Sequence, residues 1–156
     1  MAEQGYNVRQ ALIAIGSGGV FGRGLGEGSQ SQLRFLPEAH TDFIFAVIGE
    51  ELGFVGVALV IGLIGVVYAR LGILLLNCRD DFAAYVILGV MVLMGIEVFI
   101  NAGMTMGLMP VVGIPFPFLS AGGSSLLIHF LLLGIVESIA RNENRAGYRL
   151  SRVAAV

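Results

Sequence analysis

The stretch Leu52–Ala69, LGFVGVALVIGLIGVVYA, runs for eighteen residues without a charged side chain. An apolar run of about 18 residues or more is typical of a helix that crosses a lipid bilayer. This stretch therefore predicts a membrane-spanning helix, which we expect to extend over residues 43–76.

Two further apolar segments follow the first. Residues 82–109 carry a single charge, Glu97, and residues 119–140 carry only Glu137 and His129 as ionisable groups. The polar turn Asn77–Asp81 separates the first two segments, and a loop at 110–118 holds three of the four prolines, which forbid a continuous helix. The sequence predicts an all-α, polytopic membrane protein with three transmembrane helices.

The composition agrees with a membrane location and excludes several functions. The chain has 156 residues, 56% hydrophobic and 13% charged, whereas soluble domains are about 25% charged. A net charge of -2 gives no basic stripe for nucleic acid. All nine basic residues are Arg, which excludes a phosphate loop ending in Lys, and the single Cys78 excludes disulfides and multi-cysteine metal sites.

The N-terminal part, residues 1–41, is polar and rich in glycine. Seven of the thirteen positions from Gly16 to Gly28 are Gly, so we expect a loop, and Val8–Ile15 is too short to span a bilayer. The first residues lack a basic leader and an apolar signal core. Since nothing here would export this loop, we expect further spanning helices upstream in the natural protein.

Arginine placement predicts the orientation, because basic residues near helix ends favour the cytoplasmic side. Six lie beside the 77–81 turn or after the last helix, namely Arg70, Arg79, Arg141, Arg145, Arg149 and Arg152; three lie on the other side, Arg9, Arg23 and Arg34. We therefore expect a single membrane domain over 1–156. Its tail, 141–156, would be cytoplasmic, and the loops at 1–41 and 110–118 would be extracytoplasmic.

Polar residues inside the spans are candidates for function, because burying them in lipid is costly. Glu97 and Asn101 are four apart and share one helical face, where they could line a wet cleft or stabilise helix packing through hydrogen bonds. A lone intramembrane histidine is more often a structural hydrogen-bonding group than a proton relay. We assign His129 no chemistry.

Two acids, Glu38 and Asp42, lie where the N-terminal loop meets the first span. A carboxylate beside apolar residues at a membrane surface can gain basicity and accept a proton. Ordinary helix capping by Asp42 or Thr41 is the alternative, and from the residues alone it is favoured. Glu50 and Glu51 are expected at the outer end of that helix.

Two glycine-rich segments could bind anions. Gly16–Gly26 could cradle phosphate through backbone N–H groups with help from Arg23, or it could be a permissive loop. Gly122, Gly123, Ser124 and Ser125 open the last span, as a helix N-terminus aimed at an anion or as small residues for close packing.

Four ordered blocks resemble the SEDS family, the FtsW, RodA and SpoVE group of polytopic peptidoglycan glycosyltransferases. They are Ala14–Gly26, the LPEAHTDFIFAVIGEELG of Leu36–Gly53, Asn101–Pro110, and Gly113–Ser125. The second block resembles the division and sporulation branch more than the elongation branch. The resemblance implies a ten-helix fold, of which this chain would be the C-terminal part.

The resemblance also implies a function: polymerising lipid II at the outer face of the bacterial cytoplasmic membrane, with a class B penicillin-binding protein and other divisome or elongasome proteins as partners. It identifies Asp42, in HTDF, as the essential acid, which would deprotonate the acceptor hydroxyl. Arg9, Arg23, Arg34 or a divalent cation could neutralise the leaving diphosphate. The remaining residues expected to bind substrate are Glu38, His40, Glu97, Asn101, Pro115, Ser120, Gly122, Gly123, Ser124 and Ser125.

The chain departs from the family pattern at three positions: Glu97 replaces Gln, Ala121 replaces Tyr, and Arg34 replaces an acid common in division members. Intramembrane polar groups also suit a flippase of lipid-linked precursor, which would depend on Glu97 more than on Asp42. A truncated, inactive membrane fragment is another alternative. We expect three helices alone to leave the cleft incomplete and inactive.

Overall fold

The computed structural model describes residues 2–24, 26 and 42–153, and the side chains among them except 2–4, 7 and 144–153. These residues form five helices and no strand: α1 (Ala2–Gly18), α3 (Ile44–Glu51), α4 (Gly53–Asn77), α5 (Asp81–Thr105) and α6 (Gly123–Val153). The predicted all-helical fold is confirmed. Within this described part of the chain, three helices are long and apolar enough to cross a membrane, as expected: Gly53–Asn77, Asp81–Thr105 and Gly123–Glu143.

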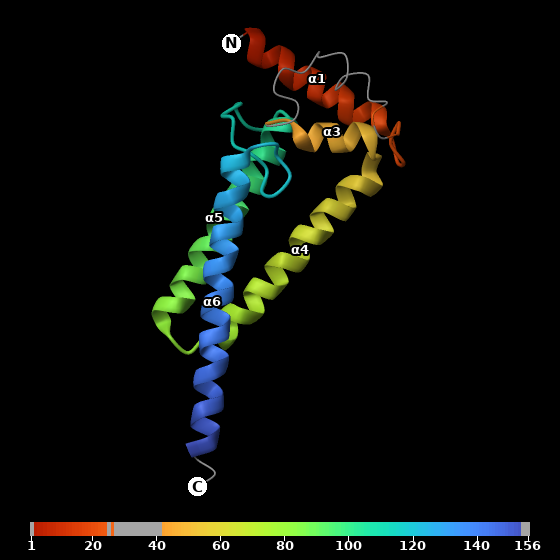
Figure 1. The fold of residues 1–156 in the computed structure, drawn as a ribbon. Helices are drawn as coiled ribbons and strands as arrows, with labels where there is room; N and C mark the ends of the chain where they lie inside the picture. Colours follow the sequence, from red (N-terminus) through yellow and green to blue (C-terminus); the bar gives the residue numbers. More distant parts are fainter. Residues whose placement is uncertain (1, 25, 27–41, 154–156) are drawn as a thin grey trace.

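The long helices and the short ones occupy different parts of the molecule. In Figure 1, α5 and α6 run side by side, α4 diverges from them, and α3 bridges the ends of α4 and α5. Helix α1 lies over α3 at the same end, whereas the C-terminus lies at the opposite end. The loop that connects α5 to α6 is at the α3 end as well. The end that carries α1, α3 and this loop is therefore where the polar segments meet.

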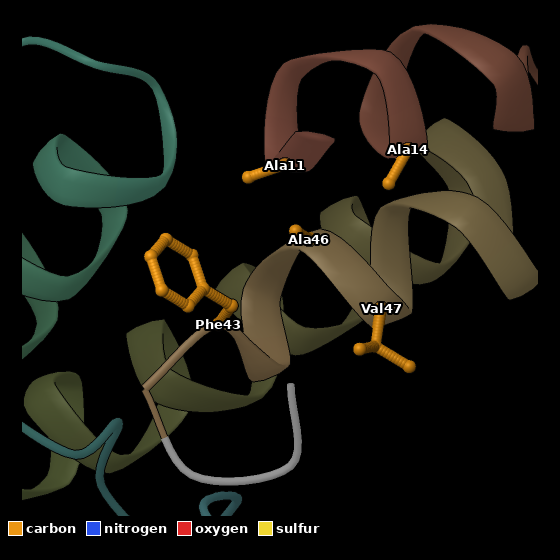
Figure 2. Close-up of a cluster of buried hydrophobic side chains, with 5 residues drawn as sticks. All are labelled: Ala11, Ala14, Phe43, Ala46 and Val47. Carbon is orange, nitrogen blue, oxygen red and sulfur yellow. The ribbon is translucent and has the colours of Figure 1, made fainter. Parts of the chain in front are cut away.

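Ala2–Gly18, within the segment 1–41 that we expect to be an extracytoplasmic loop, is helical. Its small residues explain the difference, because Ala11 and Ala14 are buried against Phe43, Ala46 and Val47 of the α3 segment (Figure 2). Tertiary packing of this kind outweighs the entropic cost of glycine in a helix.

The single helix expected over 43–76 is divided in two. Helix α3 ends at Glu51 and α4 begins at Gly53, whose φ of 64° lies in the left-handed region that glycine tolerates. The other two spans also differ in extent: α5 ends at Thr105, and α6 begins at Gly123 and continues as a helix to Val153, within the segment expected to be a tail.

Two apolar clusters hold the spans. The first joins the long helices through Leu71, Ile87, Val90, Met94 and Val136. The second joins α3, α4 and the 110–118 loop through Phe45, Ile48, Val60 and Phe116, with the Phe45 and Phe116 rings stacked at a centroid distance of 6.0 Å. The proline loop is thus packed against the helices at the polar end.

Candidate active site

Asp42 lies just before α3, at the point where that helix meets the loop between α5 and α6. Asp42 is half-buried, and an atom placed at the Cβ position of Gly113 would lie 3.1 Å from Asp42 Oδ2. The N-cap of α3 is Phe43, whose side chain makes no capping hydrogen bond, and Thr41 lies outside the described residues. The capping explanation for Asp42 is therefore not supported, and its carboxylate faces the glycine of the loop.

Asn101 connects the two segments that meet at Asp42. It is completely buried, and its Nδ2 donates hydrogen bonds to the backbone carbonyl oxygens of Asp42 (3.0 Å) and Ile114 (2.8 Å). These contacts favour the packing alternative for Asn101 over a place on a wet cleft. The sequence did not reveal this role, since Asp42 and Ile114 are 59 and 13 residues away along the chain.

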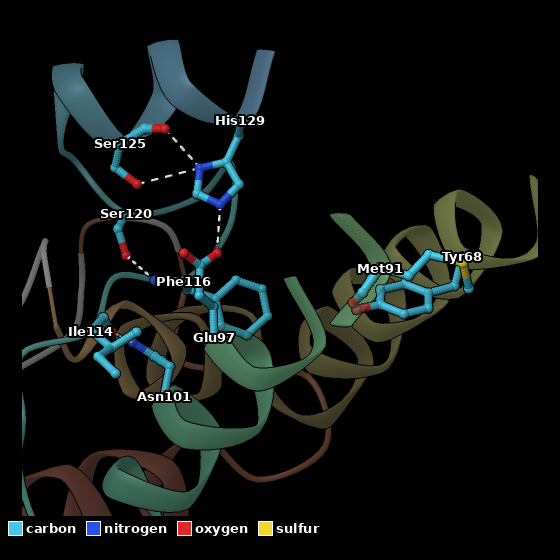
Figure 3. A network of polar contacts seen from close by, with 9 residues as sticks. All are labelled: Tyr68, Met91, Glu97, Asn101, Ile114, Phe116, Ser120, Ser125 and His129. Carbon is cyan, nitrogen blue, oxygen red and sulfur yellow. Dashed lines mark hydrogen bonds and ion pairs between the residues drawn. The ribbon is translucent and has the colours of Figure 1, made fainter. Parts of the chain in front are cut away.

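The proline loop is held by its own hydrogen bonds. The Phe116 backbone N–H donates to Ser120 Oγ at 2.7 Å, and Ser120 is buried (Figure 3). Phe118 has a φ of 63°, which is uncommon for a residue with a side chain. Ser120 therefore stabilises a strained turn, while Pro115, just before Phe116, is half-buried.

Glu97 and His129 form a contact that the sequence analysis missed. His129 Nε2 lies 2.6 Å from Glu97 Oε2, and Nδ1 lies 2.7 Å from the Ser125 carbonyl oxygen (Figure 3). Because that carbonyl can only accept, Nδ1 must carry a proton. The pair then shares one further proton and is neutral overall, which lowers the cost of placing two ionisable groups in the membrane-spanning region. The sequence offered one indication of this contact, since charged groups within a membrane span are usually paired.

This arrangement is not a serine hydrolase triad, although Ser125 Oγ lies 3.4 Å from His129 Nδ1. A general base must accept the serine proton at that nitrogen, and here the nitrogen donates to a carbonyl instead. His129 is also 2% exposed. The contact agrees with the structural role expected for His129, and it gives Glu97 a partner within the protein.

The first glycine segment turns its backbone N–H groups inward. Those of Arg23 and Gly24 donate to the carbonyl oxygens of Glu50 (3.0 Å) and Glu51 (3.1 Å), and that of Gly22 donates to Gly18 (2.8 Å). A phosphate cradle needs such groups unoccupied. The phosphate alternative is therefore not supported for residues 22–24, which join α1 to the break between α3 and α4.

The second glycine segment surrounds the start of α6. Gly122 donates its N–H to the Ser120 carbonyl oxygen at 2.8 Å, and Gly123 and Ser124 are exposed. The first N–H groups of a helix lack partners within the helix. Anion binding and close packing both remain predictions for this segment.

Some expected site residues lie outside the described residues: Arg34, Glu38 and His40. Among the residues that are described, no three His, Cys, Asp or Glu side chains gather in a way that could hold a metal ion. The divalent cation stays a prediction. The structure thus brings Asp42 together with Asn101 and the proline loop, and it places Glu97 with Ser125 at the neighbouring α5–α6 contact.

These features define a class: a helical membrane protein with a carboxylate at one end of its spans, between a short helix and a proline-rich loop. The family model for cell cycle proteins of the FtsW, RodA and SpoVE group matches residues 1–145. The chain belongs to this family.

Similar proteins include some named FtsW and some named MrdB. The chain is 47% identical over 136 residues to the "Probable peptidoglycan glycosyltransferase FtsW" of Trichlorobacter lovleyi, covering 87% of this chain and 35% of that protein. It is 46% identical over 135 residues to the "Peptidoglycan glycosyltransferase MrdB" of Escherichia coli K12, covering 86% and 36%. The two sequence identities are too similar to distinguish between branches, so the division or sporulation branch stays a prediction.

One solved structure has the same fold, with a TM-score of 0.70 and 32% identity over 86% of this chain and 37% of that one. Its subject is the "Structural coordination of polymerization and crosslinking by a peptidoglycan synthase complex". The chain therefore spans slightly more than a third of the length of the proteins it matches.

Proposed function

We propose that this chain forms the part of a peptidoglycan glycosyltransferase that carries its proton-accepting acid, Asp42. The observation that carries the proposal is the half-buried carboxylate whose backbone is bound by Asn101 and whose Oδ2 faces Gly113. A catalytic base needs partial burial and a fixed position, and this arrangement supplies both. The substrate we propose is lipid II, a disaccharide-peptide on an undecaprenyl diphosphate.

In the proposed reaction Asp42 accepts the proton of the acceptor sugar 4-hydroxyl as that oxygen attacks the anomeric carbon of the donor. The bond from that carbon to the diphosphate breaks, and the diphosphate leaves with its lipid. Attack opposite the leaving group inverts the configuration, so an α-linked donor becomes a β-linked strand. Arg9, Arg23, Arg34 or a divalent cation would neutralise the leaving group.

We also propose the setting of this reaction. The protein would lie in the bacterial cytoplasmic membrane with Asp42 on the outer face and the C-terminus in the cytoplasm. A class B penicillin-binding protein would crosslink the new strand, together with divisome or elongasome proteins. The position of α1, α3 and the proline loop at one end, opposite the C-terminus, supports this orientation (Figure 1).

The test uses a chimera of Escherichia coli MrdB in which the matched segment is replaced by this chain. Purified chimera is given lipid II, and glycan strands are measured. We expect Asp42→Asn to abolish polymerisation and the matched variant Glu97→Gln to retain most of it. Loss of strands with Glu97→Gln alone would reject Asp42 as the base and favour the transporter, which depends on the intramembrane acid.

A further inference from the structure

Asn101 is so placed that it could set the position of Asp42 without touching substrate. Its side chain is completely buried, which keeps it away from a ligand in solvent or lipid. Both of its N–H groups are used on backbone oxygens, at 3.0 Å to Asp42 and 2.8 Å to Ile114. One amide thus joins three segments: α5, the start of the α3 segment, and the proline loop.

The orientation of this amide is fixed by its partners. Carbonyl oxygens accept hydrogen bonds and cannot donate, so the NH2 group must face Asp42 and Ile114. The other atom, Oδ1, is buried and has no hydrogen-bond partner among the described residues. A buried acceptor without a partner costs free energy. The two N–H donors, and not the acceptor, are therefore what asparagine contributes at this position.

The loop bound by Asn101 also faces the carboxylate. Gly113 precedes Ile114, and its Cβ position lies 3.1 Å from Asp42 Oδ2. The same hydrogen bonds that fix the backbone of Asp42 therefore fix the distance between its carboxylate and the wall opposite. Misplacing a reacting group by about 1 Å can slow an enzyme by roughly 100-fold.

We propose that Asn101 is a positioning residue for the proton-accepting acid: its amide fixes the Asp42 backbone against the proline loop and so sets where the carboxylate meets the acceptor hydroxyl. This inference rests on the proposed function of Asp42. It separates Asn101 from the substrate-binding residues, because it predicts an effect on turnover and none on the affinity for lipid II.

The test compares Asn101→Asp, which keeps the shape and loses both N–H donors, with Thr105→Val as the matched control. Thr105 is also completely buried in α5, but its hydroxyl donates only to the Asn101 and Ala102 carbonyl oxygens of its own helix. In the MrdB chimera, we expect Asn101→Asp to lower kcat about 30- to 100-fold with KM within about twofold. Thr105→Val should retain kcat within about threefold.

Hydrogen exchange provides a second measurement that does not depend on activity. We expect Asn101→Asp to speed backbone exchange near Asp42 and Ile114 and to leave α4 unchanged. Uniformly faster exchange, or an equal loss of kcat in Thr105→Val, would reduce Asn101 to a general packing residue and overturn the inference.

The two proposals fail in different ways. Full activity of Asp42→Asn would overturn the proposed function. An inactive Asp42→Asn beside a fully active Asn101→Asp would leave that function standing and overturn the positioning role. A rise in KM with unchanged kcat would also overturn it, because that result indicates a substrate contact.

Discussion

The contact between Glu97 and His129 shows how ionisable side chains can lie within a membrane span at a low cost in free energy. The proton on His129 Nδ1 is directed at the Ser125 carbonyl, so the only variable proton lies between Nε2 and Oε2. Glu97 is one turn from Asn101, and its side chain is 20% exposed. A neutral pair beside the candidate site stabilises the α5–α6 contact without adding net charge near the place proposed for the leaving diphosphate.

Replacing Glu97 separates hydrogen bonding from charge. In Glu97→Gln the new amide N–H can donate to an unprotonated Nε2, so we expect a loss of unfolding free energy below about 1 kcal/mol. In Glu97→Ala the buried imidazole loses its hydrogen-bond partner, and we expect a loss of roughly 2–3 kcal/mol. Unfolding of the purified protein in detergent measures both, and equal losses would contradict the shared-proton explanation.

The space in front of Asp42 depends on one glycine. Gly113 has a φ of 67°, and a methyl group there would lie 3.1 Å from Asp42 Oδ2. We expect Gly113→Ala in the chimera to lower polymerisation at least about 10-fold, because the strained backbone and the added carbon both displace the carboxylate. Gly89→Ala is the control, since nothing lies within 4 Å of its Cβ position. Equal activity of the two variants would argue against a crowded site.

At the scale of elements, the glycine segment after α1 and the break between α3 and α4 form one structure. Gly19 and Val20 accept the backbone N–H groups of Phe54 and Val55 at 3.0 and 3.1 Å, while Arg23 donates to Glu50. A Cβ on Gly53 would collide with the Gly22 nitrogen. Glycine is required here because two backbones touch, which explains why both sequence blocks are rich in it.

That contact predicts the cost of adding a methyl group. We expect Gly22→Ala and Gly53→Ala to lower the free energy of unfolding by about 2 kcal/mol or more, since each combines a positive φ with a backbone collision. Gly62→Ala in α4 should be neutral or slightly stabilising, because its Cβ position is open and alanine favours helices. Thermal unfolding of the three variants checks this, and three similar midpoints would contradict it.

The elements differ in how far the sequence predicted them. The three spans could be recognised because apolar length is a local property of the chain. Helix α1 could not, because its stability comes from Ala11 and Ala14 packing on a segment some thirty residues away. The break at Gly53 lies inside a segment whose apolar length predicted one continuous helix. The contacts of Asn101 with Asp42 and Ile114 depend on how the chain returns to the same end. The residues alone offered Asp42 as a candidate proton acceptor but favoured helix capping, and only the family resemblance identified it as the essential acid.

For the whole molecule, the separation of its two ends determines how it must lie in a membrane. Phe21, beside α1 and α3, is 84% exposed at the end that carries Asp42, and Asn142 is exposed in α6, next to the end of the candidate span Gly123–Glu143. If the proposed orientation holds, these positions face opposite sides. The six arginines near the second end favour its retention in the cytoplasm.

Cysteine labelling measures this orientation directly, because Cys78 is the only cysteine of this chain. In a Cys78→Ser background, a membrane-impermeant maleimide should label Phe21→Cys in cells whose cytoplasmic membrane is intact, and it should label Asn142→Cys only after that membrane is permeabilised. Labelling of both variants after permeabilisation is the control for thiol reactivity. The reverse pattern would place Asp42 in the cytoplasm, where no glycan strand is extended, and would overturn the proposed function together with the orientation.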